Sequence, residues 1–199
     1  MSEQGLAIDI DDTLADTAVA CFQVIYEKYG QLTDKSLTEL IAQYRQPGSV
    51  PAWQTIQIQT LIRNTIEDPD WLSQVPPIES AATVIQRLST TVPVSLYISS
   101  RLTHHQSVTE KWLLAHGFPL APVKLRTIDE TRPNWKLAFL AAMYPDTYGL
   151  IDNELGFLPV EKHEYRGRLL WFNRYHTPTL HPQLLEFSDW QSIGQILKS

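Results

Sequence analysis

Three aspartates, Asp9, Asp11 and Asp12, follow the apolar run LAI near the start of the chain. While the chain stays extended, residues two positions apart point to the same side, so Asp9 and Asp11 can face one site. Like charges this close repel one another unless a cation or a proton intervenes. A turn or a helix cap accounts for Asp12 and Thr13, but it does not account for two carboxylates that end an apolar strand. The spacing therefore predicts a functional site here.

Other polar residues also lie where apolar runs end. Ser99, Ser100 and Arg101 lie at the end of the run VPVSLYIS and just beyond it, Lys136 lies near the start of an expected helix, and Asp152 follows GLI. A serine hydroxyl can donate to a phosphate oxygen, and arginine adds positive charge. Each of these residues alone is an ordinary turn, helix-start or solvated residue. Their weight comes from their shared place at the ends of apolar runs.

The apolar pattern predicts strands that alternate with helices over most of the chain. The expected strands are 5–10, 92–99, 123–127, 148–152 and 168–172, and the expected helices beside them are 79–88, 103–116, 135–143 and 190–197. Such alternation favours a mostly parallel sheet covered on both faces. Ligands of such sheets bind beyond the carboxyl ends of the strands. The expected fold class is α/β, a Rossmann-like, doubly wound, mostly parallel sheet with an inserted small helical cap.

The segment after the first strand does not fit this alternation. Helical spacing of apolar residues predicts helices over 16–29 and 33–44 and another that starts near Pro51 and runs to Ile66, and Pro76-Pro77 marks a boundary. The expected domains are therefore an α/β core from 1–15 and 78–199, and a helical insertion at 16–77. We expect this insertion to act as a cap over the carboxyl edge of the sheet.

The order of these residues resembles the haloacid dehalogenase (HAD) superfamily, whose members are mostly phosphatases. The matches are DIDDT from residue 9 to the first motif DxDx[TV], Ser99 in YISSR to the second, Lys136 to the third and Asp152 in LIDNE to the fourth. The likeness spans about residues 5 to 160, and the insertion lies where the family carries its C1-type cap. YISSR and the small size most resemble the members that act on 5′-nucleotides.

The resemblance implies a Mg²⁺-dependent phosphatase that acts on a small phosphomonoester through an aspartyl-phosphate, with a nucleoside monophosphate as one candidate substrate. Asp9 would attack phosphorus, and Asp11 would protonate the leaving alcohol and then activate water. The phosphate-binding residues would be Ser99, Ser100, Lys136 and Arg101. Their positive charge and hydroxyl groups suit the oxygens of a transferring phosphoryl group.

The resemblance also implies a metal site for Mg²⁺, which takes oxygen ligands and bridges carboxylates to phosphate. The implied ligands are the Asp9 side chain, the Asp11 backbone carbonyl and the Asp152 side chain. Many members carry a second acid directly after the motif-four aspartate or four to five residues later, and this chain carries none at those positions. Asn153 is therefore the fourth candidate at the metal site, with Glu154 as its alternative.

Two other interpretations stay open. A catalytically weak HAD-fold protein that binds or senses a phosphorylated ligand fits the Asn153 departure, whereas retention of both Asp9 and Asp11 favours turnover. A signalling receiver domain also combines acidic residues, a serine and a lysine with Mg²⁺. It needs a phosphate-accepting aspartate at the end of the third strand, where this chain has VKLRT and Asp129 comes too late.

Composition limits the partners and the location that we expect. The net charge is −6, and the chain has no Lys/Arg block of the kind that binds a nucleic-acid polymer. A small phosphorylated substrate remains compatible, because a bound cation can reverse the local field. Cys21 is the only cysteine, and neither a signal peptide nor a membrane span is visible. We therefore expect a cytoplasmic protein.

Overall fold

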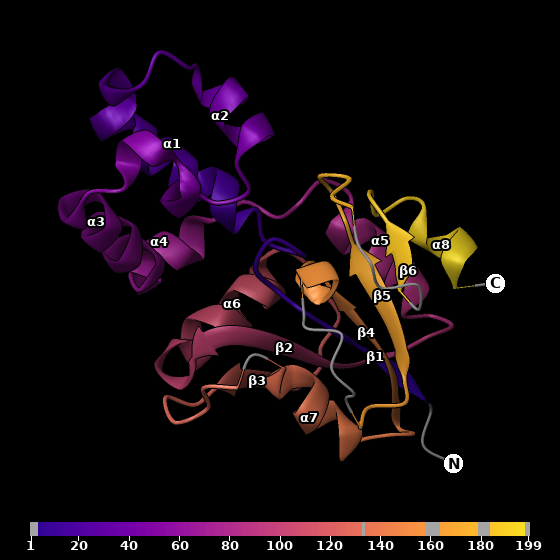
Figure 1. The fold of residues 1–199 in the computed structure, drawn as a ribbon. Helices are drawn as coiled ribbons and strands as arrows, with labels where there is room; N and C mark the ends of the chain where they lie inside the picture. Colours follow the sequence, from indigo (N-terminus) through magenta and orange to yellow (C-terminus); the bar gives the residue numbers. More distant parts are fainter. Residues whose placement is uncertain (1–3, 133, 158–163, 179–183, 198–199) are drawn as a thin grey trace. The chain divides into compact units, whose positions relative to one another are not determined.

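The computed structural model describes residues 4–132, 134–157, 164–178 and 184–197. The chain divides into two compact units, which Figure 1 shows along the colour ramp from indigo to yellow. Met1–Leu14 and Pro77–Ser199 form an α/β unit, and Ala15–Pro76 form a helical unit. The α/β unit is therefore assembled from two stretches of chain that the helical unit separates.

A parallel sheet forms the centre of the α/β unit. Over the described residues it has six strands in the order β3-β2-β1-β4-β5-β6. They are β1 (Gly5–Ile8), β2 (Val94–Leu102), β3 (Val123–Arg126), β4 (Thr147–Asp152), β5 (Arg168–Phe172) and β6 (Leu185–Phe187). Every pairing among these strands is parallel. The strand order changes direction between β1 and β4, which is where doubly wound sheets bind their ligands.

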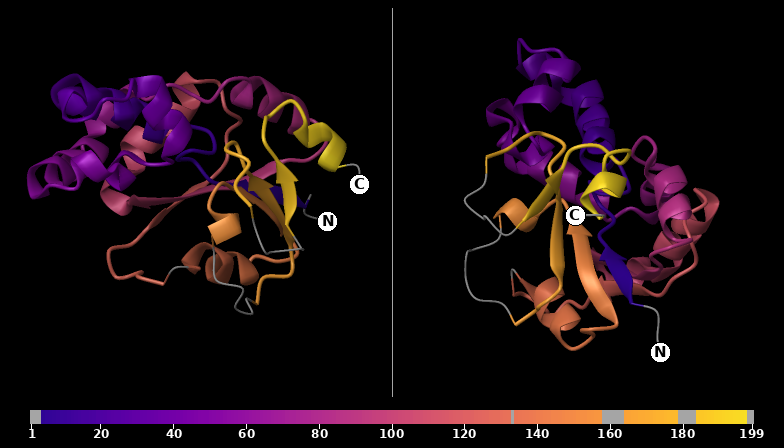
Figure 2. Two further views of the ribbon diagram at one scale, coloured as in Figure 1. Left: turned by 45° about the horizontal axis from the view of Figure 1, so that its top comes forward. Right: turned by 90° about the vertical axis from the view of Figure 1, so that its right-hand side faces the viewer.

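Helices cover both faces of this sheet. They are α5 (Ala81–Leu88), α6 (Gln106–Ala115), α7 (Trp135–Ala141) and α8 (Ile193–Ile196). Leu96 and Ile98 of β2 belong to one buried cluster with Leu137 of α7. Tyr97 lies between them in sequence and points to the other face, where its ring lies 6.4 Å from that of Phe118, just after α6. Figure 2 shows α7 on one face and α5 and α6 on the other, which confirms the predicted Rossmann-like, doubly wound fold.

The helical unit has its own apolar core. Its helices are α1 (Thr17–Tyr29), α2 (Leu37–Gln43), α3 (Ile56–Ile66) and α4 (Pro69–Gln74), with 3₁₀ turns at Gly30–Leu32, Pro47–Ser49 and Pro51–Trp53. Trp53 is fully buried and packs on Phe22 with 5.9 Å between ring centroids. Ile25, Leu40 and Ile58 complete this core. Among the described residues, no helix is both long enough and apolar enough to cross a membrane.

Several boundaries differ from those expected. The helix expected from Pro51 is broken, because Thr55 takes an extended conformation and its side chain accepts a hydrogen bond from the backbone N–H of Ile58, which starts α3 there. The strand expected to end at Ser99 continues to Leu102. The last helix begins at Ile193, three residues later than expected. Strand β6 and helix α4 were missed, since runs of three and six residues carry too little periodicity to be recognised.

Candidate active site

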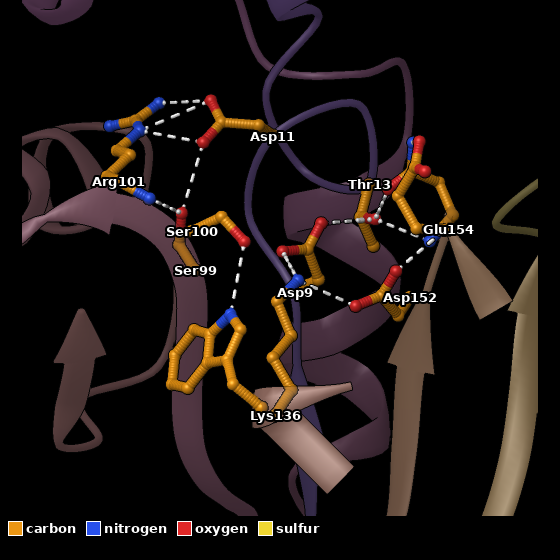
Figure 3. Close-up of polar contacts among 11 residues, drawn as sticks. Asp9, Asp11, Thr13, Ser99, Ser100, Arg101, Lys136, Asp152 and Glu154 are labelled. Carbon is orange, nitrogen blue, oxygen red and sulfur yellow. Dashed lines mark hydrogen bonds and ion pairs between the residues drawn. The ribbon is translucent and has the colours of Figure 1, made fainter. Parts of the chain in front are cut away.

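Three candidate residues lie at the carboxyl end of the sheet on neighbouring strands. Asp9 follows β1 directly, Asp152 is the last residue of β4, and Ser99 lies near the end of β2. The backbone N–H of Asp9 donates to the carbonyl of Ile151 at 2.9 Å, which continues the contact between β1 and β4 by one residue. Figure 3 shows Asp9, Ser99 and Asp152 together at this edge of the sheet.

Lys136 joins the two central carboxylates. It lies in the first turn of α7, and its Nζ donates to Asp9 Oδ1 at 2.5 Å and to Asp152 Oδ2 at 2.7 Å. The lysine side chain is 13% exposed and each aspartate side chain 4%. Two carboxylates buried this deeply are strongly unfavourable without a compensating charge, and the ammonium supplies that charge.

Burial and neighbouring charges set the protonation of this trio. Burial raises the pKa of Asp9 to about 8; the Lys136 ammonium opposes this, and the negative charges of Asp152 and Asp11 add to it. Burial lowers the pKa of Lys136, but the adjoining carboxylates of Asp152 and Asp9 outweigh burial, so its pKa is raised above the ordinary value. Lys136 is thus a cation, and a further positive charge beside Asp9 would favour the carboxylate form.

Thr13 holds the Asp9 carboxylate from the opposite side. Its side chain is fully buried, and its hydroxyl donates to Asp9 Oδ2 at 2.9 Å and accepts from the Asn153 backbone N–H at 3.1 Å. A turn at Asp12, which has a left-handed φ of 57°, brings this hydroxyl back toward Asp9. The sequence indicated only a turn or cap role for Thr13, besides its place in the first motif.

Two buried tryptophans fix the backbone on either side of that contact. The indole N–H of Trp190 donates to the Thr13 carbonyl at 3.0 Å, and that of Trp171 donates to the Asn153 carbonyl at 2.9 Å. Both indoles are at most 1% exposed. No motif predicted either contact, because each joins residues that are distant in sequence and only the apolar context of the tryptophans is visible there.

Asp11 has different partners from Asp9. The Ser99 hydroxyl donates to Asp11 Oδ2 at 3.1 Å. Arg101 donates from Nε to both oxygens of Asp11, at 3.2 and 3.0 Å, and from Nη2 to Oδ1 at 2.8 Å. Its Nη1 donates to Thr109 Oγ1 at 3.3 Å. The contacts of Arg101 are thus with a carboxylate and a hydroxyl, and its expected phosphate-binding role stays a prediction.

The remaining candidates lie beside this centre. Ser100 is exposed, and its hydroxyl accepts from the Trp135 indole N–H at 3.4 Å. Asn153 is buried, and its side-chain amide donates to Glu154 at 3.4 Å, while the backbone N–H of Glu154 donates to Asp152 Oδ1 at 2.6 Å. A cavity of about 300 Å³ adjoins them, with polar lining from Ser100, Asn134, Lys136, Asp152 and Glu154.

The donor set fits a hard divalent cation. Asp9 and Asp152 both reach one cationic nitrogen, so their carboxylate oxygens converge on a common point. Carboxylate and carbonyl oxygens are the ligands that Mg²⁺ prefers. Within the described contacts, the three carboxylates of Asp9, Asp11 and Asp152 face two cations, Lys136 and Arg101. When Asp9 is ionised, this leaves one negative charge in excess, which favours a further cation at the site.

Comparison with known proteins connects this chain to others through its fold. No protein-family model matches the chain, and no curated protein matches it. A structure described as a HAD hydrolase, YfnB from Bacillus subtilis bound to magnesium, superposes with a TM-score of 0.58 at 15% identity, covering 100% of each chain. A HAD family hydrolase from Deinococcus radiodurans R1 with bound phosphate and sodium has a TM-score of 0.54 at 13% identity, covering 99% of this chain and 96% of that one.

A third structure is named as a predicted phosphoglycolate phosphatase from Haemophilus somnus 129pt. Its TM-score is 0.56 at 11% identity, with 99% of each chain covered. Identities this low establish a shared fold and no more. The chain therefore has the α/β fold of the HAD hydrolases.

Proposed function

We propose that this protein is a Mg²⁺-dependent phosphatase that hydrolyses a small phosphomonoester through an aspartyl-phosphate on Asp9. The observation that carries the proposal is the convergence of Asp9, Asp152 and Lys136 in a buried site at the carboxyl end of the sheet. The adjoining cavity of about 300 Å³ suits a small ligand. Further support comes from the fold, which is shared with proteins named as a phosphatase and as a phosphate-bound hydrolase.

In the first step, an Asp9 oxygen forms a bond to phosphorus while the bond from phosphorus to the leaving oxygen breaks. The Thr13 hydroxyl, 2.9 Å from Asp9 Oδ2, holds the carboxylate in one orientation for this attack. Lys136 and the Ser100 hydroxyl stabilise the negative charge on the phosphoryl oxygens. The Ser99 hydroxyl joins them by turning its proton from Asp11 toward the phosphoryl group. Fixed positive charges and donors of this kind supply most of the catalysis of phosphoryl transfer.

Asp11 moves the protons. It donates one to the leaving oxygen, so the product departs as a neutral alcohol. It then accepts a proton from the water that attacks the aspartyl-phosphate, which releases inorganic phosphate and restores the Asp9 carboxylate. Asp11 suits this role because its side chain is 29% exposed and can reach water, whereas the Asp9 side chain is buried.

Mg²⁺ would be held by the side chains of Asp9 and Asp152 and by the Asp11 backbone carbonyl, with Asn153 as a further oxygen donor. When bound, it supplies positive charge that offsets the repulsion between a carboxylate and a phosphate dianion. Asn153 is buried and adjoins Asp152 in sequence, which supports its place in this set.

The finer assignments rest on sequence. The helical unit 15–76 is the proposed C1-type cap, because it is inserted directly after the first strand and its loop. A nucleoside monophosphate is the proposed substrate class, on the likeness of YISSR to nucleotidase motifs. The proposed location is cytoplasmic, because the chain has one cysteine.

The proposal is tested by assaying hydrolysis of p-nitrophenyl phosphate and a panel of nucleoside monophosphates and sugar phosphates. We expect turnover with Mg²⁺, none with EDTA, and a loss of roughly a thousandfold or more in Asp9→Asn. Wild-type rates in Asp9→Asn would refute the assignment of the nucleophile. Binding of Mg²⁺ and phosphate without turnover of any substrate would instead favour a ligand-binding protein, the alternative that Asn153 supports.

A further inference from the structure

A buried arginine makes a two-point contact with the proposed acid–base residue. The guanidinium of Arg101 reaches Asp11 through both Nε and Nη2, in a two-point arrangement that fixes the plane and the direction of the carboxylate. The Arg101 side chain is 4% exposed, while that of Asp11 is 29% exposed. The arginine is therefore buried, whereas the carboxylate that it contacts keeps partial exposure to solvent.

An irregularity in strand β2 directs the arginine to this position. The pairing of β2 with β3 aligns Ser99 with Leu125, but the next pair is Leu102 with Arg126, so Ser100 and Arg101 are extra residues on β2. Such bulges redirect side chains and are frequent beside active sites. The backbone N–H of Arg101 donates to Ser99 Oγ at 3.1 Å, and that hydroxyl donates to Asp11, which closes a ring of contacts.

Stability alone does not explain this arrangement. Burying an ion pair costs desolvation that its attraction often fails to repay, so a buried pair is weak support for a stabilising role. Three guanidinium nitrogens of Arg101 already donate to Asp11 and Thr109. A role as a phosphate ligand would require the guanidinium to give up some of these contacts.

Building on the proposed function, we propose that Arg101 is a positioning residue, which holds Asp11 in the orientation that protonates the leaving group. It does not bind the transferred phosphoryl group. Thr109 is fully buried, and its hydroxyl accepts a hydrogen bond from the third guanidinium nitrogen. Thr109 thus orients Arg101, and Arg101 in turn orients Asp11.

Substrates with different leaving groups separate the two roles. p-Nitrophenolate departs without protonation, whereas the alkoxide of β-glycerophosphate needs a proton from Asp11. The ratio kcat/KM reports the steps up to and including the departure of the leaving group, so it isolates this difference. We expect Arg101→Gln to lower kcat/KM for β-glycerophosphate by roughly a hundredfold. For p-nitrophenyl phosphate we expect kcat/KM to fall by about tenfold or less. Inhibition by inorganic phosphate should not change.

Two further variants complete the design. Arg101→Lys keeps the charge but cannot make a two-point contact, so we expect it to show the same preference for the aryl substrate. Arg132→Gln is the matched control, because Arg132 also grips a carboxylate, that of Glu130, but is 63% exposed. We expect wild-type kinetics from this control with both substrates.

Four results would overturn the inference. Equal losses on both substrates with weakened phosphate inhibition would assign Arg101 to the phosphoryl group. Unchanged kinetics in Arg101→Gln would deny it any role. If circular dichroism shows that Arg101→Gln does not fold, Thr109→Val is assayed in its place. A fall in kcat/KM of Thr109→Val that is equal for the two substrates counts against the proposal. Should the wild type hydrolyse no phosphomonoester of the panel that tests the proposed function, that function fails, and this inference fails with it.

Discussion

Replacing Thr13 by valine removes one hydroxyl from the centre of the α/β unit and keeps the shape of the side chain. The hydroxyl makes two contacts that matter, a donated bond to Asp9 Oδ2 at 2.9 Å and an accepted bond from the Asn153 N–H at 3.1 Å. Thr13 is fully buried, and Asn153 is 9% exposed. Water is therefore poorly placed to replace either partner.

The cost follows from these two contacts. A buried N–H left without a partner costs about 1–3 kcal/mol, and a hydrogen bond to a charged group contributes about 1.5–3 kcal/mol. Because one substitution removes both and the site relaxes in part, we expect the free energy of unfolding to fall by about 2–4 kcal/mol in total. For a chain of this size each kcal/mol lowers Tm by about 2–4 °C, so the expected drop is roughly 5–15 °C.

Thermal unfolding followed by circular dichroism measures this drop, and Thr13→Ser is the matched control. Serine keeps the hydroxyl and loses one methyl group, which costs about 1 kcal/mol of buried apolar contact. Thr13→Val should therefore melt below Thr13→Ser, although valine is the more apolar residue. A Thr13→Val protein that melts at or above Thr13→Ser would show that these hydrogen bonds do not hold the loop.

Three other predictions concern the same unit. Lys136→Met leaves the carboxylates of Asp9 and Asp152 without their cation. Urea unfolding should show that the free energy of unfolding falls by about 3–5 kcal/mol. The exposed control Lys111→Met should change it little. Mg²⁺ at about a hundred times its Kd should stabilise the wild type by about 2.7 kcal/mol in a thermal melt, and Asp152→Asn should lose most of that shift. Trp190→Phe removes the indole N–H that donates to the Thr13 carbonyl. The free energy of unfolding in urea should fall by about 1–2 kcal/mol, and an unchanged urea midpoint would contradict this prediction.

The fold was predictable because its strands are apolar runs followed by polar residues. The runs that end near Asp9, Ser99 and Asp152 are all buried strands in the structure. Parallel strands bring their carboxyl ends to one edge of the sheet, so the meeting of these residues followed from topology alone. Lys136 was reachable in the same way, since α7 begins at that edge.

The supporting contacts were not predictable from the sequence. The Trp190 indole meets the Thr13 carbonyl across 177 positions of sequence, and nothing local to either residue marks such a pairing. The grip of Arg101 on Asp11 depends on a shift of register between two strands, which has no signal in the pattern of apolar residues. Contacts of this kind depend on how helices and strands pack against one another, and local sequence patterns do not predict that packing.

The central position of β1 has a consequence for how the protein is made. β1 pairs with β2 and β4, yet it precedes both in the chain and leaves the ribosome before them. One partner of Asp9, Thr13, follows within four residues, but Lys136 lies 127 positions further along the chain. Synthesis proceeds from the N-terminus, so the helical unit, one continuous stretch, is complete while β1 still has no strand to pair with. The proposed site is therefore complete only after Asp152 has been synthesised, when most of the chain has already left the ribosome.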